Sequence, residues 1–156
     1  AVNSLSKTYS IPGIRVGWVA SNTEVADILR DYRDYTMICA GVFDDMVATL
    51  VLENKEAILE HNRQIVEENL ALMDEWIAKE PKASWIRPAS VSTSFVKLDV
   101  NRPIEDFALE LLQDYGVLVV PGNRFDKESH VRIGYCCDKE VLQKGLEKLS
   151  QFLNKC

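Results

Sequence analysis

The chain has 156 residues, 47% of them hydrophobic and 27% charged, and a formal net charge of −6 at pH 7. These proportions are those of a globular protein and exclude a largely disordered or low-complexity chain. Because the balance is acidic and the lysines and arginines are scattered, a nucleic-acid-binding module or a basic membrane-surface protein is disfavoured. No apolar run approaches the roughly 20 residues that a membrane span requires.

The four cysteines, Cys39, Cys136, Cys137 and Cys156, have neither the spacing of a zinc site nor that of a disulfide framework. We therefore expect reduced thiols in a cytoplasmic protein, and no metal site. The first residues do not resemble a secretory leader, which favours the same compartment.

The first half of the chain predicts one strand followed by three helices. An apolar run at residues 16–20, after a Pro-Gly pair, predicts a buried strand. Helices are predicted at residues 24–35 and 44–53. Residues 54–80 hold no proline or glycine, and their apolar positions recur at steps of three and four. A helix of this length would measure about 40 Å, which favours a connection between two bodies.

The second half predicts the order strand, strand, helix, strand, strand, helix. The strands are expected at residues 84–87, 94–100, 117–120 and 130–135, and the helices at residues 103–115 and after a cap at Asp138. Apolar and polar residues alternate through 94–100, which predicts a strand with one buried face. This order favours a small antiparallel or mixed sheet with helices on one face, an α+β arrangement.

Residues 4–17 bring hydroxyl, amine and guanidinium groups together, from Ser4, Ser6, Lys7 and Arg15. Small hydroxyl side chains and a Pro-Gly turn allow a backbone to approach an anion closely, and the planar guanidinium of Arg15 suits a phosphate. Lys7 is the one amine of the segment, and an amine in a desolvated, cationic setting becomes nucleophilic. On composition alone, a loop of solvated basic residues is the competing interpretation.

Two later segments carry further residues of interest. Residues 116–125 contain a hydrophobic run followed by Pro-Gly-Asn-Arg-Phe, and residues 131–135 place Arg132 in a predicted strand. Taken alone, the first segment is compatible with any strand followed by a turn. Arg132, taken alone, is compatible with an ordinary strand arginine in a surface ion pair.

Together, in this order, the three segments resemble the fold-type I, pyridoxal-phosphate-dependent aminotransferases of class I/II. That family's lysine motif is Ser-x-[Ser/Ala]-Lys, then about seven residues, then Arg-x-Gly, and each part is present here between Ser4 and Gly17. The resemblance implies an α/β fold, the C-terminal part of the fold-type I transferase fold, in which a small α+β domain has three to five strands flanked by helices. It divides the chain into a remnant of the large cofactor-binding domain at residues 1–53, a long connecting helix at 54–81 and the small domain at 82–156.

The resemblance also implies a role for each candidate residue. Lys7 would hold pyridoxal 5′-phosphate as a Schiff base and shuttle a proton between the substrate α-carbon and the cofactor. Ser4 and Arg15 would bind the cofactor phosphate, and Arg132 would pair with the α-carboxylate of the substrate. The implied substrates are an α-amino acid and a 2-oxo acid, and the full-length form would be a homodimer.

The resemblance covers only the C-terminal part of the family. The segment with the ring-stacking aromatic residue and the aspartate for the pyridine nitrogen cannot be placed here, so we interpret the chain as a fragment and expect it to be inactive alone. Two alternatives stay open. One is a lyase of the same fold, acting on carbon–sulfur bonds or resembling aminocyclopropane-carboxylate synthase, and the other is a non-catalytic α+β interaction domain. No segment indicates which side chain the substrate carries.

Overall fold

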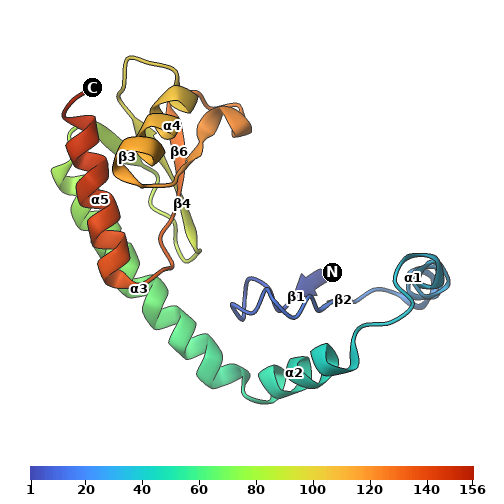
Figure 1. Ribbon diagram of the computed structural model, residues 1–156. Coiled ribbons are helices and arrows are strands. Elements are labelled where there is room, and N and C mark those ends of the chain that lie inside the picture. The colour runs from blue at the N-terminus through green and yellow to red at the C-terminus, as the bar shows by residue number, and fades with distance from the viewer. The chain divides into compact units, whose positions relative to one another are not determined.

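The computed structural model describes all 156 residues and divides into two units, Ala1–Asn62 and Arg63–Cys156. The division falls inside the long helix α3 (Lys55–Lys79), which is green in Figure 1. Each unit has a hydrophobic core of its own. The boundary between the two units lies within the helix that was expected to connect them. The division into three parts predicted from the sequence stays a prediction.

The first unit contains a short two-stranded sheet. β1 (Val2–Ser4) pairs antiparallel with β2 (Gly17–Val19), in a register that sets Ser4 opposite Gly17. β2 lies within the strand predicted at residues 16–20, but all three of its residues are exposed, so the prediction that this strand is buried was wrong. No pattern in the sequence predicts β1, which is three residues long and becomes a strand through its pairing with β2.

Leu5 is the centre of the small core of this unit. Its side chain is 0% exposed and packs with Ala48 and Val51 of α2 (Val42–Glu53). Partly buried side chains complete the cluster: Tyr9, Ile11, Ile14, Val16 and Ile58. The Leu5 N–H donates to the Val16 carbonyl at 3.1 Å, and the Leu5 carbonyl accepts the Ile11 N–H at 3.1 Å. The segment that carries Lys7 is therefore a closed loop, anchored on α2 through one side chain.

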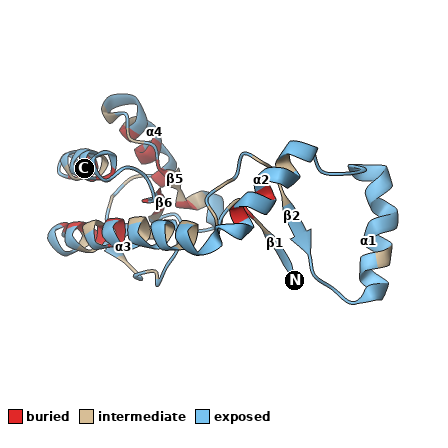
Figure 2. Ribbon diagram, turned by 90° about the horizontal axis from the view of Figure 1, so that it is seen from below, coloured by how far each residue is buried: buried red, intermediate tan, exposed pale blue.

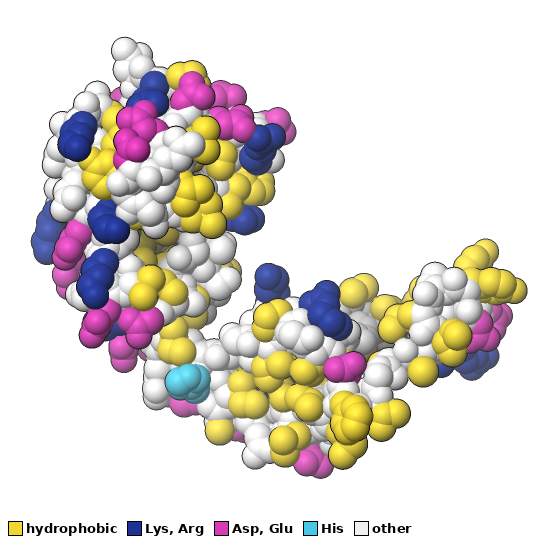
Figure 3. Space-filling model, viewed as in Figure 1, with side chains coloured by type: hydrophobic (Ala, Val, Ile, Leu, Met, Phe, Trp, Pro, Cys, Tyr) yellow, Lys and Arg dark blue, Asp and Glu magenta, His cyan; other side chains and the backbone are white.

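Many apolar side chains of this unit lie on its surface. α1 (Thr23–Thr36) is capped by the Asn22 side chain and contains no buried residue, as Figure 2 shows along the whole helix. The exposed apolar side chains of α1 and α2 include Ile28, Tyr32, Phe43, Met46 and Leu50. Figure 3 shows hydrophobic side chains gathered over α2. Exposed apolar surface of this extent is typical of faces that pack against further protein.

The second unit is a four-stranded antiparallel sheet with helices on one face. Its strands are β3 (Ala83–Trp85), β4 (Thr93–Leu98), β5 (Val120–Pro121) and β6 (His130–Gly134), in the spatial order β3-β4-β6-β5. Its helices are the rest of α3, α4 (Ile104–Tyr115), the short 3-10 helix η1 (Gly122–Phe125) and α5 (Lys139–Leu153). The expected small α+β sheet flanked by helices is confirmed.

The strand predicted at residues 117–120 is shorter than expected, because β5 holds only Val120 and Pro121. The Val117 N–H takes part in the end of α4, where it donates to the Leu111 carbonyl at 3.4 Å. Strand pairing therefore begins only after the helix has been terminated. Val119 is nevertheless buried, which accounts for the apolar run in the sequence.

The core of the second unit lies between the sheet and its helices. One face of the two central strands supplies Val96, Leu98, Val131 and Ile133, all of them buried. Phe107 of α4 and Phe152 of α5 meet above them, with ring centroids 4.8 Å apart. The alternation predicted for residues 94–100 is thus confirmed, since the intervening side chains of β4 point away from this core.

Two buried side chains of α3, Trp76 and Asn69, hydrogen-bond to the rest of the second unit. Trp76 Nε1 donates to Ser150 Oγ of α5 at 2.8 Å. The Asn69 side chain is 2% exposed, and its Nδ2 donates to the Tyr135 carbonyl at 2.7 Å and to the Cys137 carbonyl at 2.8 Å. α3 is the longest helix, yet neither it nor any other helix combines the length and the apolar content that crossing a bilayer requires.

Gly17 faces the backbone of β1 too closely to carry a side chain. A Cβ atom at this position would lie 2.8 Å from the Asn3 carbonyl oxygen and 3.1 Å from the Ser4 Cβ. We expect Gly17→Ala to push the two strands apart and to destabilise the first unit by about 1–3 kcal/mol. Amide hydrogen exchange at Leu5, whose N–H closes the loop, should become at least about fivefold faster. Gly13→Ala is the control, because a Cβ atom there meets nothing within 4 Å; equal exchange in the two variants would contradict the prediction.

Gly122 lies where η1 passes close to the backbone that leads into β6. A Cβ atom at Gly122 would overlap the carbonyl oxygens of Lys127 and His130, neither of which can move without shifting the chain. We expect Gly122→Ala to lower the free energy of unfolding of the second unit by about 1–3 kcal/mol, measured as the urea midpoint. Gly134→Ala, at an open position on β6, should keep the midpoint of the unaltered chain. The prediction fails if both variants unfold at the same urea concentration.

Candidate functional site

Lys7 lies in the exposed part of the loop that Leu5 anchors. Its carbonyl accepts the Ser10 N–H at 3.3 Å in a turn. Asn62 Nδ2 donates to the Thr8 carbonyl at 3.3 Å, which ties the loop to α3 within the same unit. The Lys7 amine takes part in none of the ion pairs of the protein. The loop thus holds the backbone of Lys7, while its side chain is exposed and takes part in no ion pair.

Ser4 stands at the end of β1, directly before the loop, and is half-buried. Its Oγ accepts the Ser6 N–H at 3.3 Å. Because the oxygen is used as an acceptor, the hydroxyl proton remains available for donation. Ser4 can therefore donate a hydrogen bond to an anion that lies beside the loop.

Arg15 stands at the other end of the loop in a left-handed backbone conformation, with φ of 51°, and Ser10 has φ of 57°. Such conformations are uncommon for residues other than glycine, cost about 1–3 kcal/mol and gather at functional sites. The Arg15 Nη1 donates to the Pro12 carbonyl at 2.8 Å. The guanidinium is exposed and pairs with no carboxylate, so its remaining N–H groups are available to an anion.

The donor set of this loop fits the phosphate and the aldehyde of pyridoxal phosphate. Residues 4–17 contain no Asp or Glu, so the charges of Lys7 and Arg15 are not compensated within the segment. A hydroxyl and a guanidinium are suitable donors for a phosphate, and an amine reacts with an aldehyde. The loop therefore offers groups of the right chemistry for both ends of the cofactor.

Arg132 lies on β6 in the second unit, opposite Phe95 of β4. It is exposed, and it takes part in no ion pair. Its Cζ lies 5.2 Å from the ring centroid of Phe125, over the face of the ring. An ordinary surface ion pair was the competing interpretation of Arg132, but in the structure Arg132 has no carboxylate partner.

His130 and Phe95 were not singled out from the sequence, although both lie beside Arg132. The imidazole of His130 stacks on the Phe95 ring with centroids 4.8 Å apart. Burial, together with the charges of Lys127 and Lys97, lowers the pKa of His130, which favours a neutral imidazole. The signal that finds these residues is register: His130 precedes Arg132 by two residues, and Phe95 is its cross-strand partner.

The structure thus places Ser4, Lys7 and Arg15 on one segment of the first unit, Ser4 at the end of β1 and the other two in the loop that follows. Arg132 belongs to the second unit, and its role stays a prediction, as do the roles of the other three residues. No group of three or more His, Cys, Asp or Glu side chains is placed to hold a metal ion.

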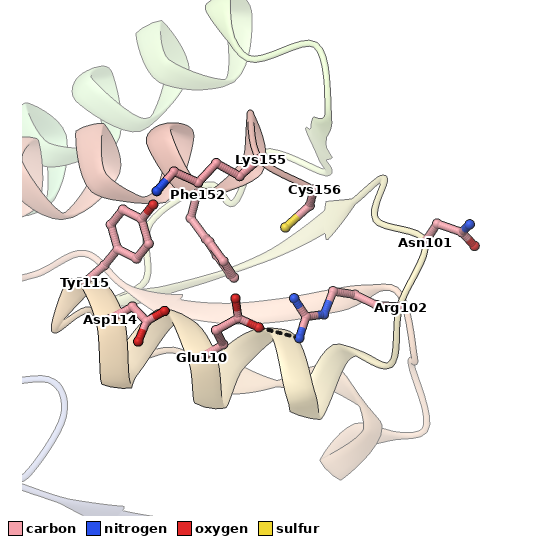
Figure 4. Close-up of a pocket in the computed structure, with 8 residues that line it drawn as sticks. All are labelled: Asn101, Arg102, Glu110, Asp114, Tyr115, Phe152, Lys155 and Cys156. Carbon is pink, nitrogen blue, oxygen red and sulfur yellow. Dashed lines mark hydrogen bonds and ion pairs between the residues drawn. The ribbon is translucent and has the colours of Figure 1, made fainter.

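A cavity of about 200 Å³ in the second unit contains none of the predicted site residues. Figure 4 shows it between α4 and the C-terminal end of α5, with Arg102 and Glu110 paired at 2.6 Å. The Lys155 amine lies over the Tyr115 ring, 5.1 Å from its centroid. Most of the charged groups around this cavity are therefore already partnered by other side chains, and no sequence motif singled them out.

Comparisons with known proteins agree with the family resemblance. The profile of the family described as "Aminotransferase class I and II" matches residues 1–149. Capreomycidine synthase of Streptomyces vinaceus is 30% identical over 151 residues, which cover 96% of this chain and 39% of that protein. LL-diaminopimelate aminotransferase of Natranaerobius thermophilus is 30% identical over 156 residues, which cover 97% of this chain and 40% of that protein.

Solved structures show the same relationship. A PLP-dependent aminotransferase from Streptococcus suis is 68% identical with a TM-score of 0.97, over 99% of this chain and 41% of that one. Aspartate aminotransferase from Thermotoga maritima is 27% identical with a TM-score of 0.85, over 98% of this chain and 39% of that one.

The chain spans about 40% of the length of the relatives that it matches. The fold expected from the sequence, the C-terminal part of the fold-type I transferase fold, is confirmed by these structures, and pyridoxal phosphate is confirmed as the cofactor of the group. Since the family profile covers nearly the whole sequence, the chain belongs to the class I and II aminotransferase family.

Proposed function

We propose that the protein to which this chain belongs transfers an amino group between an α-amino acid and a 2-oxo acid, with pyridoxal phosphate as cofactor. The observation that carries the proposal is the loop closed by Leu5 and Val16, which presents Ser4, Lys7 and Arg15 without a carboxylate in the segment. The 68% identity to the Streptococcus suis aminotransferase supports the same activity. Because the chain spans about 40% of such proteins, we propose that it is inactive alone.

In this proposal each residue of the loop has one task. The Lys7 Nζ binds the cofactor aldehyde and moves a proton at the substrate α-carbon. Ser4 Oγ and the Arg15 guanidinium hold the phosphate by a hydroxyl donor and by charge-assisted hydrogen bonds. When bound, the cofactor supplies the electron sink for the α-carbon.

Arg132 is proposed to bind the α-carboxylate of the substrate. Its guanidinium can form two parallel hydrogen bonds to a carboxylate, and no carboxylate of the protein occupies it. A bidentate contact of this kind fixes which bond of the α-carbon is aligned for reaction.

A second candidate function is a cyclisation or lyase reaction on the same cofactor. Two findings favour it: the similarity to capreomycidine synthase, and 28% identity with a TM-score of 0.91 to a structure described as a PLP-dependent cyclase. Both candidates need Lys7, and they differ in whether the amino group leaves the substrate carbon for a 2-oxo acid.

We also propose a cytoplasmic homodimer for the full-length form. The apolar side chains exposed on α1 and α2 support an interface with further protein, and the four cysteines are all free and exposed, which suits a reducing compartment.

Lys7 should react with pyridoxal phosphate in preference to other lysines of the chain. After incubation with the cofactor and reduction with borohydride, peptide mass spectrometry should find at least about tenfold more adduct on Lys7 than on Lys55, because a phosphate held by Ser4 and Arg15 adds charge-assisted hydrogen bonds. Arg15→Leu should remove the preference, and so should pyridoxal without its phosphate. Equal labelling of all exposed lysines would count against the site.

Catalysis is best tested in a chimera in which this chain replaces the corresponding segment of the Streptococcus suis aminotransferase, which it matches at 68% identity. We expect amino transfer to a 2-oxo acid, and a rate at least about 100-fold lower in Lys7→Ala, because a proton-transfer group is lost. Lys55→Ala is the matched control. A chimera that consumes the amino acid without aminating the 2-oxo acid would support the second candidate, and one in which Lys7→Ala keeps full activity would rule out both.

A further inference from the structure

The face of the second unit's sheet that points away from the core groups three rings around Arg132. Phe95 of β4 is the cross-strand partner of Arg132, and His130 precedes Arg132 by two residues on β6, so the three side chains share one face. Phe125, at the end of η1, contacts both Phe95 and Arg132. None of these rings belongs to the hydrophobic core of the unit.

The rings contact one another in a defined order. His130 stacks on Phe95 with 17° between the ring planes, and Phe95 meets Phe125 edge to face, with centroids 5.8 Å apart and 82° between planes. Both separations fall within the roughly 4.5–7 Å of favourable aromatic pairs. Phe125 thus contacts Phe95 edge to face, and the guanidinium of Arg132 lies over the Phe125 ring.

Arg132 also differs from the other arginines of this unit. Each of the others has a carboxylate partner: Arg63 with Glu67, Arg87 with Asp74, Arg102 with Glu110, and Arg124 with Glu105. An ion pair fixes a guanidinium but uses its N–H groups, which point outward in its plane. A contact with an aromatic face fixes the same group through its flat side and leaves those N–H groups free.

We propose that Phe125 is a positioning residue for Arg132, holding its guanidinium over the ring face so that its N–H groups stay free to bind a carboxylate. The proposal rests on the function proposed above for Arg132. Phe95 and His130 act indirectly, because Phe95 contacts the Phe125 ring and His130 stacks on Phe95. An arginine that is already oriented loses less side-chain freedom when it binds, so the ring contact should strengthen carboxylate binding.

The test is an NMR measurement on the 156-residue chain labelled with ¹⁵N-arginine. We expect the Arg132 Hε signal to be shifted upfield by the Phe125 ring current, and its Nε to be more rigid, by heteronuclear NOE, than that of Arg33, which is exposed on α1 and takes part in no ion pair. Phe125→Leu should abolish both signatures, and Phe125→Tyr should restore them. Titration with acetate, followed at the same signal, should show a half-saturation concentration roughly two- to fivefold higher in Phe125→Leu, the range of a cation–π contact at an exposed site.

Leu109→Ala is the matched control, because Leu109 is an apolar side chain of α4 that is 53% exposed, close to the 44% of Phe125. The positioning role is overturned if Arg132 of the unaltered chain is as mobile as Arg33, or if Phe125→Leu changes nothing. A rigid Arg132 that does not respond to acetate overturns the carboxylate role of the previous subsection and leaves the positioning role standing. Labelling of Lys7 by the cofactor is a separate measurement and is unaffected by either result.

Discussion

The burial of Leu5 is the constraint on which the lysine loop depends. This side chain lies two residues before Lys7, is completely enclosed, and packs with Ala48 and Val51 of α2. Its own N–H closes the loop on Val16. A long basic side chain can thus stand in solvent while its backbone is held by an apolar neighbour. The first unit has three buried hydrophobic residues in its core, so a large part of its stability rests on this contact.

The elements that the sequence predicts well are those whose signals are local. The apolar steps of residues 54–80 correspond to α3, Asp138 caps α5 by accepting from the N–H groups of Glu140 and Val141, and the alternation through β4 buries Val96 and Leu98. β1 could not be found in this way, because it is a strand only through pairing with a segment fifteen residues later. The short β5 was misjudged for a related reason, since the end of α4 takes the N–H of Val117.

The candidate site also has features that local sequence predicts and features that it does not. Residue order was enough to single out Ser4, Lys7, Arg15 and Arg132, because a motif is a local property of the chain. Sequence could not indicate that Arg15 has a left-handed backbone. Nor could it indicate the rings beside Arg132, because Phe95 reaches it through strand register and Phe125 through a turn. Backbone conformation and cross-strand contacts depend on residues that are distant in sequence. They determine how the candidate residues are positioned, which a motif alone does not.

The tryptophans are divided between the two units in a way that has a practical consequence. Trp18 lies in β2 and is 38% exposed, whereas Trp76 is 9% exposed and donates to Ser150 from within the second core. Trp85, in β3, is half-buried in that same unit. Indole fluorescence moves to longer wavelength as water gains access to the ring. Replacing Trp18 by Phe would leave a chain whose tryptophan emission reports the second unit alone. Subtracting its fluorescence from that of the unaltered chain would give the emission of Trp18, so that the unfolding of each unit could be followed separately.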